Sequence, residues 1–325
     1  MIIVSKVITI GETLIDFLPT ETGVSLKDVS GFTKMPGGAP ANVAVCVKRL
    51  GAESQIITKI GLDAFGDYLL DLLSSTGIDC PSVFRTNAAN TALAFVSLQE
   101  NGQREFSFYR NPSADMLLTD TEIDESWFSK GDILHFCSVD LLDAPVKGAH
   151  DEAIRLAKEN GLLISFDPNV RLPLWNDKEK CRETINDYIP KADILKVSDD
   201  ELCFITGIDD EKQAIQSLLS KVTLLIYTKG DRGAELFTKD MHVCHRGFEV
   251  KAIDTTGAGD SFIGAVLYNL LSVSSVANLT SNELLKIAAF ANATASLVVT
   301  QKGAINAMPT MEEVQRFLDK QDEVV

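Results

Sequence analysis

The sequence predicts an α/β protein in which helices cover both faces of a mainly parallel sheet, with a small β-subdomain attached. From about residue 130 onward, short apolar runs alternate with helical patterns, which is typical of such a sheet. Two β-rich runs in the first third, Thr91–Leu98 and Gln103–Tyr109, break this alternation. The chain has 325 residues, of which 45% are hydrophobic, so its core needs no disulfides or metals.

The N-terminal residues 1–10 form the first predicted strand, which ends at Gly11. This stretch lacks the features of a signal peptide, and no apolar run approaches the roughly 18 residues of a membrane span. The chain carries 30 Lys and Arg against 46 Asp and Glu, a net charge of −16 at pH 7. This charge excludes a nucleic acid or an anionic membrane as partner. The six scattered cysteines form no CxxC pair, so we expect reduced thiols in a soluble, cytoplasmic protein.

The β-subdomain comes from two parts of the first third of the chain. Phe17–Lys34 has no helical period, and Asn101-Gly102 lies between the two β-rich runs at the place of a tight hairpin turn. We predict lid strands within about 14–35 and 90–112, inserted into one α/β body that spans residues 1–325. The alternative is an edge hairpin of the main sheet.

The α/β body follows as strands and helices in turn. Ligands in such sheets bind at the carboxyl ends of the strands, so polar residues after each run are candidates for a site. The predicted strands lie at 133–136, 162–166, 193–197 and 223–227, and the predicted helices at Ala149–Asn160, in a stretch up to Tyr188, and at Glu201–Leu219.

A glycine-rich segment at residues 253–262, IDTTGAGDSF, precedes the predicted helix Ile263–Leu271. Gly257 and Gly259 let the backbone turn at a helix N-terminus, where free N–H groups and the helix dipole bind anions without basic side chains. An acidic protein can therefore hold phosphate here. Asp260 is well placed to take a proton from a hydroxyl while the amides stabilise a transferring phosphoryl group. The alternative is a structural Asp cap after a glycine-rich turn.

Other nucleotide and hydrolase motifs are absent from the sequence. It contains no GxGxxG after the first strand, no GxxxxGK[ST] and no GxSxG, so dinucleotide-binding, P-loop and Ser-His-Asp mechanisms have no support. The stretch Met241–His245 contains two histidines and a cysteine, but on a strand His242 and Cys244 face one way and His245 the other. We therefore expect no metal site there.

The segment DTTGAGD resembles the C-terminal signature of the ribokinase-like (PfkB) sugar kinases, and GGAPANVA at 37–44 is similar to their other signature. The resemblance runs through nearly the whole chain. Three stretches resemble fructokinases in particular: GETLIDF at 11–17, FYRNPSAD at 108–115 and FDPNVR at 166–171. The resemblance implies a ribokinase-like three-layer α/β/α sandwich with a β-sheet lid, in which ATP and Mg²⁺ serve to phosphorylate the C6 hydroxyl of fructose.

The resemblance also implies roles for individual residues. Asp260 would be the catalytic base, and the backbone of Gly257, Ala258 and Gly259 would form the anion hole for the γ-phosphate. The sugar would be bound by Asp16, Gly37, Gly38, Asn42, Tyr109, Arg110 and Arg171, and ATP by Thr228, Gly230, Gly233 and Asn292. For several of these residues the alternative is a structural role without a ligand. The alternatives are a turn aspartate for Asp16, a helix-capping loop for Gly37 and Gly38, a surface charge for Arg110, a plain turn after a strand for 228–233 and a packed polar residue for Asn292.

The metal residues depart from the family pattern. Where the family often carries N-x-x-E, this chain has Ser198-Asp-Asp-Glu201, so Glu201 keeps a water-mediated role toward Mg²⁺ while the Asn position is Ser. The alternative for this acidic run is helix N-terminal capping. Some relatives imply a K⁺ site, which would fall at Asp254, Thr256 and Gly303.

Three other functions stay open. A 2-keto-3-deoxygluconate kinase would use Arg110 and Arg171 to hold the substrate carboxylate, and another sugar kinase of the family is a second alternative. An inactive kinase-like scaffold protein would be expected to lose Asp260 or the anion-hole glycines, and the sequence keeps both. Exposed lid edges suggest a homodimer joined through the lid strands.

Overall fold

A central sheet of nine strands organises the chain. The computed structural model describes residues 5–21, 23–98 and 104–322. The strand order is β13-β12-β11-β10-β9-β8-β1-β4-β5, and all neighbours from β11 to β5 pair in parallel, while β12 pairs antiparallel with both β11 and β13. Its strands are β1 Lys6–Ile10, β4 Glu53–Gly61, β5 Val83–Thr86, β8 Ile133–Cys137, β9 Leu163–Asp167, β10 Ile194–Ser198, β11 Leu224–Thr228, β12 Ala234–Phe237 and β13 His242–His245.

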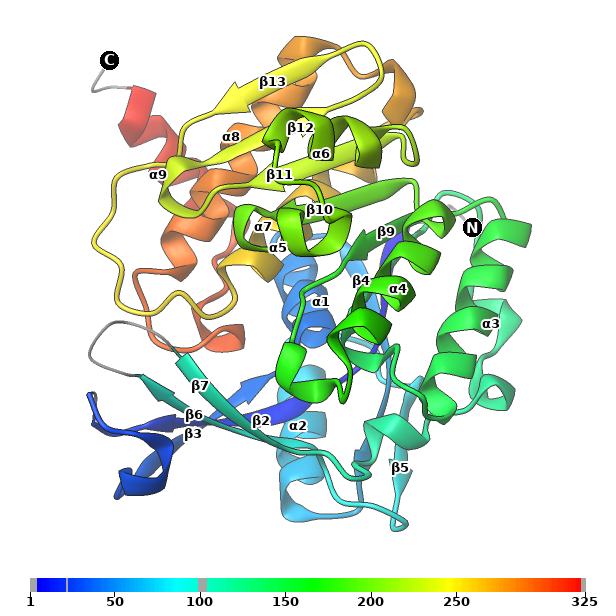
Figure 1. Ribbon diagram of the computed structural model, residues 1–325, viewed down its shortest axis with the longest axis vertical. Helices are drawn as coiled ribbons and strands as arrows, with labels where there is room; N and C mark the ends of the chain where they lie inside the picture. The colour runs from blue at the N-terminus through cyan, green and yellow to red at the C-terminus, as the bar shows by residue number, and fades with distance from the viewer. Residues whose placement is uncertain (1–4, 22, 99–103, 323–325) are drawn as a thin grey trace.

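Helices cover both faces of this sheet and make the three layers that the sequence predicts (Figure 1). Alternate strand residues enter opposite cores: Val7 packs on one side and Ile8 on the other, because successive side chains of a strand point to opposite faces. One face carries α1 Ala39–Arg49, α2 Ala64–Ser75, α7 Ala258–Leu270, α8 Ser281–Val298 and α9 Met311–Asp322; the other carries α3 Pro145–Glu159, α4 Lys178–Tyr188, α5 Asp199–Thr206 and α6 Glu211–Leu219. Among the described residues, no helix combines the length and apolarity needed to cross a membrane.

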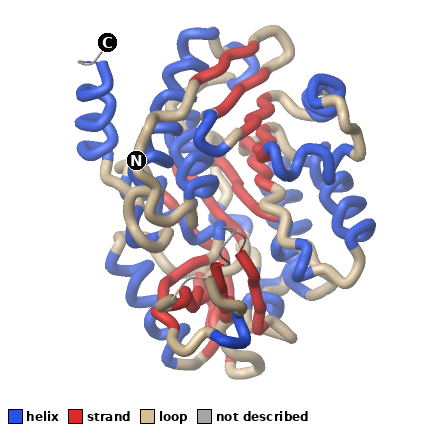
Figure 2. The backbone as a smooth tube through the Cα atoms, turned by 60° about the vertical axis from the view of Figure 1, so that its left-hand side comes forward, coloured by secondary structure: helices blue, strands red, loops and turns tan. Residues whose placement is uncertain are grey.

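The β-rich runs form a second sheet, apart from the main one, in the order β3-β2-β6-β7. Figure 1 shows it below the central sheet, and Figure 2 shows its strands grouped at the same end of the molecule. The interpretation as an edge hairpin of the main sheet is therefore wrong. β6 and β7 pair antiparallel as a hairpin requires, but the predicted turn at Asn101-Gly102 lies outside the described residues. The strands are β2 Leu14–Pro19, β3 Phe32–Gly37, β6 Leu93–Leu98 and β7 Arg104–Tyr109.

Some predicted boundaries are wrong for local reasons. The helix predicted over Glu201–Leu219 is two helices, because Gly207 adopts φ of 67° and ends α5 there. The helix predicted from Ala149 begins at Pro145, since proline is tolerated in the first turn of a helix. The helix predicted from Ile263 begins at Ala258, so Asp260 belongs to its first turn.

Candidate active site

A cavity of about 190 Å³ lies between the lid sheet and the carboxyl-end side of the central strands. The lid contributes residues of β2, β6 and β7, and the body contributes the N-termini of α1 and α7 and the segments after β8 and β9. This is where ligands bind in open α/β sheets. The lining residues on which the chemistry depends are Glu12, Asp16, Gly38, Asn42, Asn169, Arg171, Lys196, Thr256, Gly257, Gly259 and Asp260.

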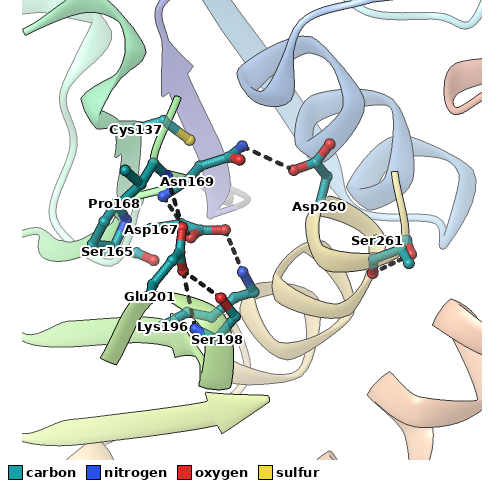
Figure 3. Close-up of polar contacts among 12 residues, drawn as sticks. Cys137, Ser165, Asp167, Pro168, Asn169, Lys196, Ser198, Glu201, Asp260 and Ser261 are labelled. Carbon is teal, nitrogen blue, oxygen red and sulfur yellow. Dashed lines mark hydrogen bonds and ion pairs between the residues drawn. The ribbon is translucent and has the colours of Figure 1, made fainter. Parts of the chain in front are cut away.

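Asp260 lies in the first turn of α7 and is held by amide side chains from two other elements. The Asn42 Nδ2 of α1 donates to its Oδ2 at 2.7 Å. The Asn169 Nδ2, after β9, reaches the Asp260 Oδ1 at 3.5 Å (Figure 3). Burial raises the pKa of Asp260, while the Asn42 hydrogen bond and the charges of Lys196 and Arg171 lower it. The result is an ionisable carboxylate with raised basicity beside the cavity, as a general base requires.

The N-terminus of α7 supplies the donors for an anion. Gly257 is its N-cap with φ of 79°, and a Cβ there would lie 2.6 Å from the Ala304 Cβ, so glycine is required by both backbone and space. The first N–H groups of a helix lack intrahelical partners. The Ala258 N–H makes a 3.3 Å bond to the Thr255 carbonyl, so this donor of the expected three already has a backbone partner.

Lys196 is a cavity residue that sequence reasoning missed. It lies in β10, is 5% exposed, and its Nζ donates to the Asp167 Oδ2 at 2.7 Å (Figure 3). Burial raises the pKa of Asp167 to about 6 despite the neighbouring Lys196 charge. A Cβ on Gly259 would lie 3.3 Å from the Lys196 Nζ, so this cation adjoins the anion hole. A lysine inside an otherwise apolar strand was the signal in the sequence.

Four of the predicted sugar residues, Asp16, Gly38, Asn42 and Arg171, line the cavity. Gly38 has φ of 106°, and a Cβ on it would lie 2.4 Å from the Glu12 carbonyl oxygen, so the loop before α1 approaches the β1–β2 connection closely. Gly37 makes room for a neighbour, because a Cβ there would lie 2.1 Å from the Asp16 Oδ2. Asn169 and Glu12 join these residues without having been predicted.

Tyr109 and Arg110 do not line this cavity; Arg110 lines a second one, and Phe108 and Leu174 line both. The expected contact of Tyr109 and Arg110 with the sugar stays a prediction. Tyr109 is 63% exposed, and its ring packs edge-on against Phe95. The alternative interpretation of Arg110 as a surface charge is wrong, because it is buried and forms ion pairs with Asp115 and Asp140.

The predicted nucleotide residues lie beyond the cavity. Thr228 ends β11 beside Ser198 of β10. Gly233 has φ of 86°, and a Cβ there would lie 2.1 Å from the His245 carbonyl oxygen, so a side chain would not fit the turn. The Asn292 Nδ2 lies 3.0 Å from the His245 Nδ1, which is the packing role given as its alternative.

The candidate metal residues are engaged in local hydrogen bonds. The Glu201 Oε2 accepts from the Ser198 N–H and hydroxyl in a capping box, and its Oε1 accepts from the Val170 N–H at 2.6 Å (Figure 3). The structure thus gives Glu201 the capping role named as the alternative.

Asp254, Thr256 and Gly303 come together, as the resemblance implies. The Asp254 Oδ1 accepts from the Thr256 N–H and hydroxyl, and its Oδ2 accepts from the Gly303 N–H at 3.0 Å. Within the part of the chain that the structure describes, no group of three or more His, Cys, Asp or Glu residues could hold a metal by itself.

The chain is similar to known sugar kinases over nearly all its length. The profile described as "pfkB family carbohydrate kinase" matches residues 4–311. "Probable fructokinase-2" of Arabidopsis thaliana is 47% identical over 320 residues, covering 98% of this chain and 97% of that protein. The crystal structure of a fructokinase with bound ATP from Xylella fastidiosa has a TM-score of 0.89 and 34% identity, covering 98% of this chain and 99% of that one. A double mutant of fructokinase from Vibrio cholerae O395, in fructose, ADP and potassium ion bound form, has a TM-score of 0.87 and 34% identity, covering 97% and 98%.

Proposed function

Because the chain belongs to the PfkB family of carbohydrate kinases, we propose that it is an ATP-dependent fructokinase that forms fructose 6-phosphate. The observation that carries this proposal is the half-buried Asp260 carboxylate, which faces a lid-covered cavity from the helix turn that also supplies the anion-binding amides. The relatives that the chain matches over nearly full length are fructokinases.

Asp260 is the general base of the proposed reaction. Its carboxylate takes the proton of the C6 hydroxyl as the sugar oxygen attacks the γ-phosphorus of ATP. The bond between that phosphorus and the bridging oxygen to the β-phosphate breaks, and ADP leaves with the electron pair. Asn42 and Asn169 hold the carboxylate in place through their amide groups. A positioned base of this kind contributes about 10²–10⁴-fold to the rate.

The transferring phosphoryl group develops its charge beside the N-terminus of α7. The backbone N–H groups from Gly257 to Gly259 and the helix dipole stabilise that charge without side-chain reorganisation. Lys196 adds a positive charge next to Gly259 and is fixed there by Asp167. A buried site strengthens each of these interactions, since its effective dielectric is lower than that of water.

The residues present fit a Mg²⁺ ion that the nucleotide phosphates hold, rather than one held by a protein cage. A carboxylate offers about four acceptor positions, and Glu201 uses three of them for the Val170 and Ser198 hydrogen bonds. Its remaining position suits one water of a hydrated Mg²⁺, which commonly keeps several waters and uses few carboxylates. When bound, the ion neutralises charge on the phosphates.

For the remaining cofactor contacts, the proposal follows the family pattern. Thr228, Gly230, Gly233 and Asn292 lie along β11, the turn after it and α8, where the nucleotide would extend beyond the anion hole. The K⁺ ion would lie near Asp254, Thr256 and Gly303. The Asp254 carboxylate already accepts hydrogen bonds from the other two residues.

The lid would close over the sugar and exclude water, which limits wasteful hydrolysis of ATP. Its four strands carry an aromatic cluster in which Phe17 stacks on Phe95, and Phe32 and Tyr109 pack edge-on against Phe95. Because Tyr109 of this cluster is exposed, a second lid could cover it in a homodimer, and light scattering of the purified protein tests this arrangement.

The test of the function is a comparison of kcat/KM for fructose, 2-keto-3-deoxygluconate and ribose with saturating ATP and Mg²⁺. We expect fructose to be preferred. A preference of about tenfold or more for either competitor, a difference of about 1.4 kcal/mol in transition-state binding, would overturn the choice of sugar. An absence of turnover with every sugar, despite normal ATP binding, would favour the kinase-like scaffold.

A further inference from the structure

At the end of the lid strand β7, the charge of Arg110 is already matched by carboxylates. Its side chain is 1% exposed and forms ion pairs with Asp115 and Asp140, whose side chains are 1% and 0% exposed. Asp140 follows β8 of the central sheet, so these pairs join the returning lid strand to the body. Asp115 is also held by the Ser113 hydroxyl at 2.5 Å. Two fixed carboxylates therefore face one guanidinium.

Glu12 lines the cavity and interacts electrostatically with Asp140 and Arg110 of this cluster. Its Oε1 accepts from the Ala39 N–H at 2.9 Å, and its Oε2 is buried with no hydrogen-bond partner among the described residues. Burial and the charge of Asp140 raise the pKa of Glu12 to about 8, although Arg110 opposes this. Burial also raises the pKa of Asp140 to about 7. Glu12 and Asp140 are thus the members that hold protons near neutral pH.

The charge of this cluster discriminates between classes of sugar. Glu12, Asp115 and Asp140 against Arg110 give −2 when all are ionised, and 0 when Glu12 and Asp140 are both protonated. In no such state is the cluster positive. A neutral sugar can donate a hydroxyl hydrogen bond to the unpartnered Glu12 Oε2. The carboxylate of a sugar acid would need a cation on the Glu12 side of the cavity in addition to Arg171, which lines it, and burying the carboxylate without one is costly.

We propose that Asp115, by pairing with Arg110, determines that the acceptor is a neutral sugar rather than a sugar acid. The proposal rests on the function proposed above and deepens it, because it names the residue that separates fructose from 2-keto-3-deoxygluconate. Asp115 acts through Arg110 and does not touch the sugar itself. Without Asp115, Arg110 faces Asp140 as its remaining ion-pair partner, so the cluster becomes one charge less negative, which is the direction that a carboxylate ligand requires.

The test is the Asp115→Asn variant of the full chain, assayed for kcat/KM with fructose and with 2-keto-3-deoxygluconate. Removing one negative charge from a buried cluster should raise the ratio of acid to fructose by about tenfold or more. A rise of less than about threefold overturns the proposal. Asp115→Ser removes the same charge with a smaller side chain and should move the ratio in the same direction, so it decides the matter if Asp115→Asn does not fold.

Two controls separate charge from damage to the fold. Glu122→Gln removes a carboxylate from the following segment, where its partner is Lys59 and not Arg110, so the ratio should stay at the wild-type value. The double variant Arg110→Met with Asp115→Asn removes one charge of each sign and should also keep the wild-type ratio. A high ratio in either control overturns the proposal. Absence of fructose phosphorylation by the wild-type chain would instead overturn the proposed function.

Discussion

Replacing Asp260 by Asn removes the base while keeping the shape of the side chain. In the wild-type structure the Asn42 Nδ2 lies 2.7 Å from the Asp260 carboxylate, and the amide of the variant can turn so that its oxygen still accepts this hydrogen bond. Only the 3.5 Å contact with Asn169 is then lost. Loss of a positioned base lowers kcat by about 10²–10⁴-fold, which is about 2.7–5.4 kcal/mol of transition-state stabilisation. We therefore expect turnover to fall while ATP binding is retained.

The same substitution should leave the folded state as stable as before or more stable. Burial raises the pKa of Asp260 in the folded chain, so its ionised form is disfavoured there relative to the unfolded chain. Above the raised pKa this carboxylate lowers the free energy of unfolding, and below it the cost disappears. Asp260→Asn removes that cost near neutral pH, and the melting temperature should be unchanged or higher.

The assays are steady-state kinetics coupled to ADP release, calorimetry of ATP binding and thermal unfolding at pH 7 to 8. A matched control is Asp63→Asn at the N-cap of α2, whose carboxylate accepts from the N–H groups of Phe65, Gly66 and Thr91. The Asn side chain keeps one accepting oxygen for the helix N–H groups and turns an NH₂ group toward the Thr91 N–H, so this control should lose about 1–2 kcal/mol of stability with little change in kcat. Near-normal turnover of Asp260→Asn, or a drop in its melting temperature like that of the control, would refute the reasoning.

Three further predictions concern the surroundings of the base. Because the Asn42 amide holds the pKa of Asp260 down against burial, Asn42→Ala should move the acid limb of the kcat/KM profile to higher pH, and an unmoved limb would contradict this. Gly257→Ala should destabilise the fold through its positive φ, whereas Gly259→Ala should not, as thermal unfolding of the pair would show. Glu201→Gln should lower stability by about 1 kcal/mol and raise the Mg²⁺ concentration for half-maximal activity; an unchanged Mg²⁺ requirement would leave only capping.

The strands of the body were predictable because near-continuous apolar runs are typical of a sheet that helices cover on both faces. Ile194–Ser198 and Leu224–Thr228 lie within one residue of their predicted positions at each end. The split at Gly207 was missed because a helical period continues on both sides of it, and a single left-handed glycine ends the first helix. The lid sheet was recognised by its lack of helical period, while its parallel pairing of β2 with β6 had no signal in the local sequence.

The site was predictable where a motif is contiguous and not where residues meet only in the fold. The functional residues between 254 and 260 lie next to one another in the chain, so Asp260 and its glycines could be named from the sequence. Lys196 and Glu12 acquire their roles from partners far along the chain, Asp167 in one case and the Arg110 cluster in the other. The charge of Arg110 suggested a contact with a ligand. Only the fold shows that its guanidinium is already ion-paired with two buried carboxylates, Asp115 and Asp140.

The identity of the phosphorylated product tests the central claim most directly. The wild-type chain is incubated with fructose, ATP and Mg²⁺, and the phosphorylated carbon is identified by ³¹P and ¹³C nuclear magnetic resonance. We predict fructose 6-phosphate with one ADP formed for each sugar phosphorylated, and a greatly reduced amount from Asp260→Asn under the same conditions. Phosphate on a different carbon, ADP formed without sugar phosphate, or equal product from the variant would contradict the account.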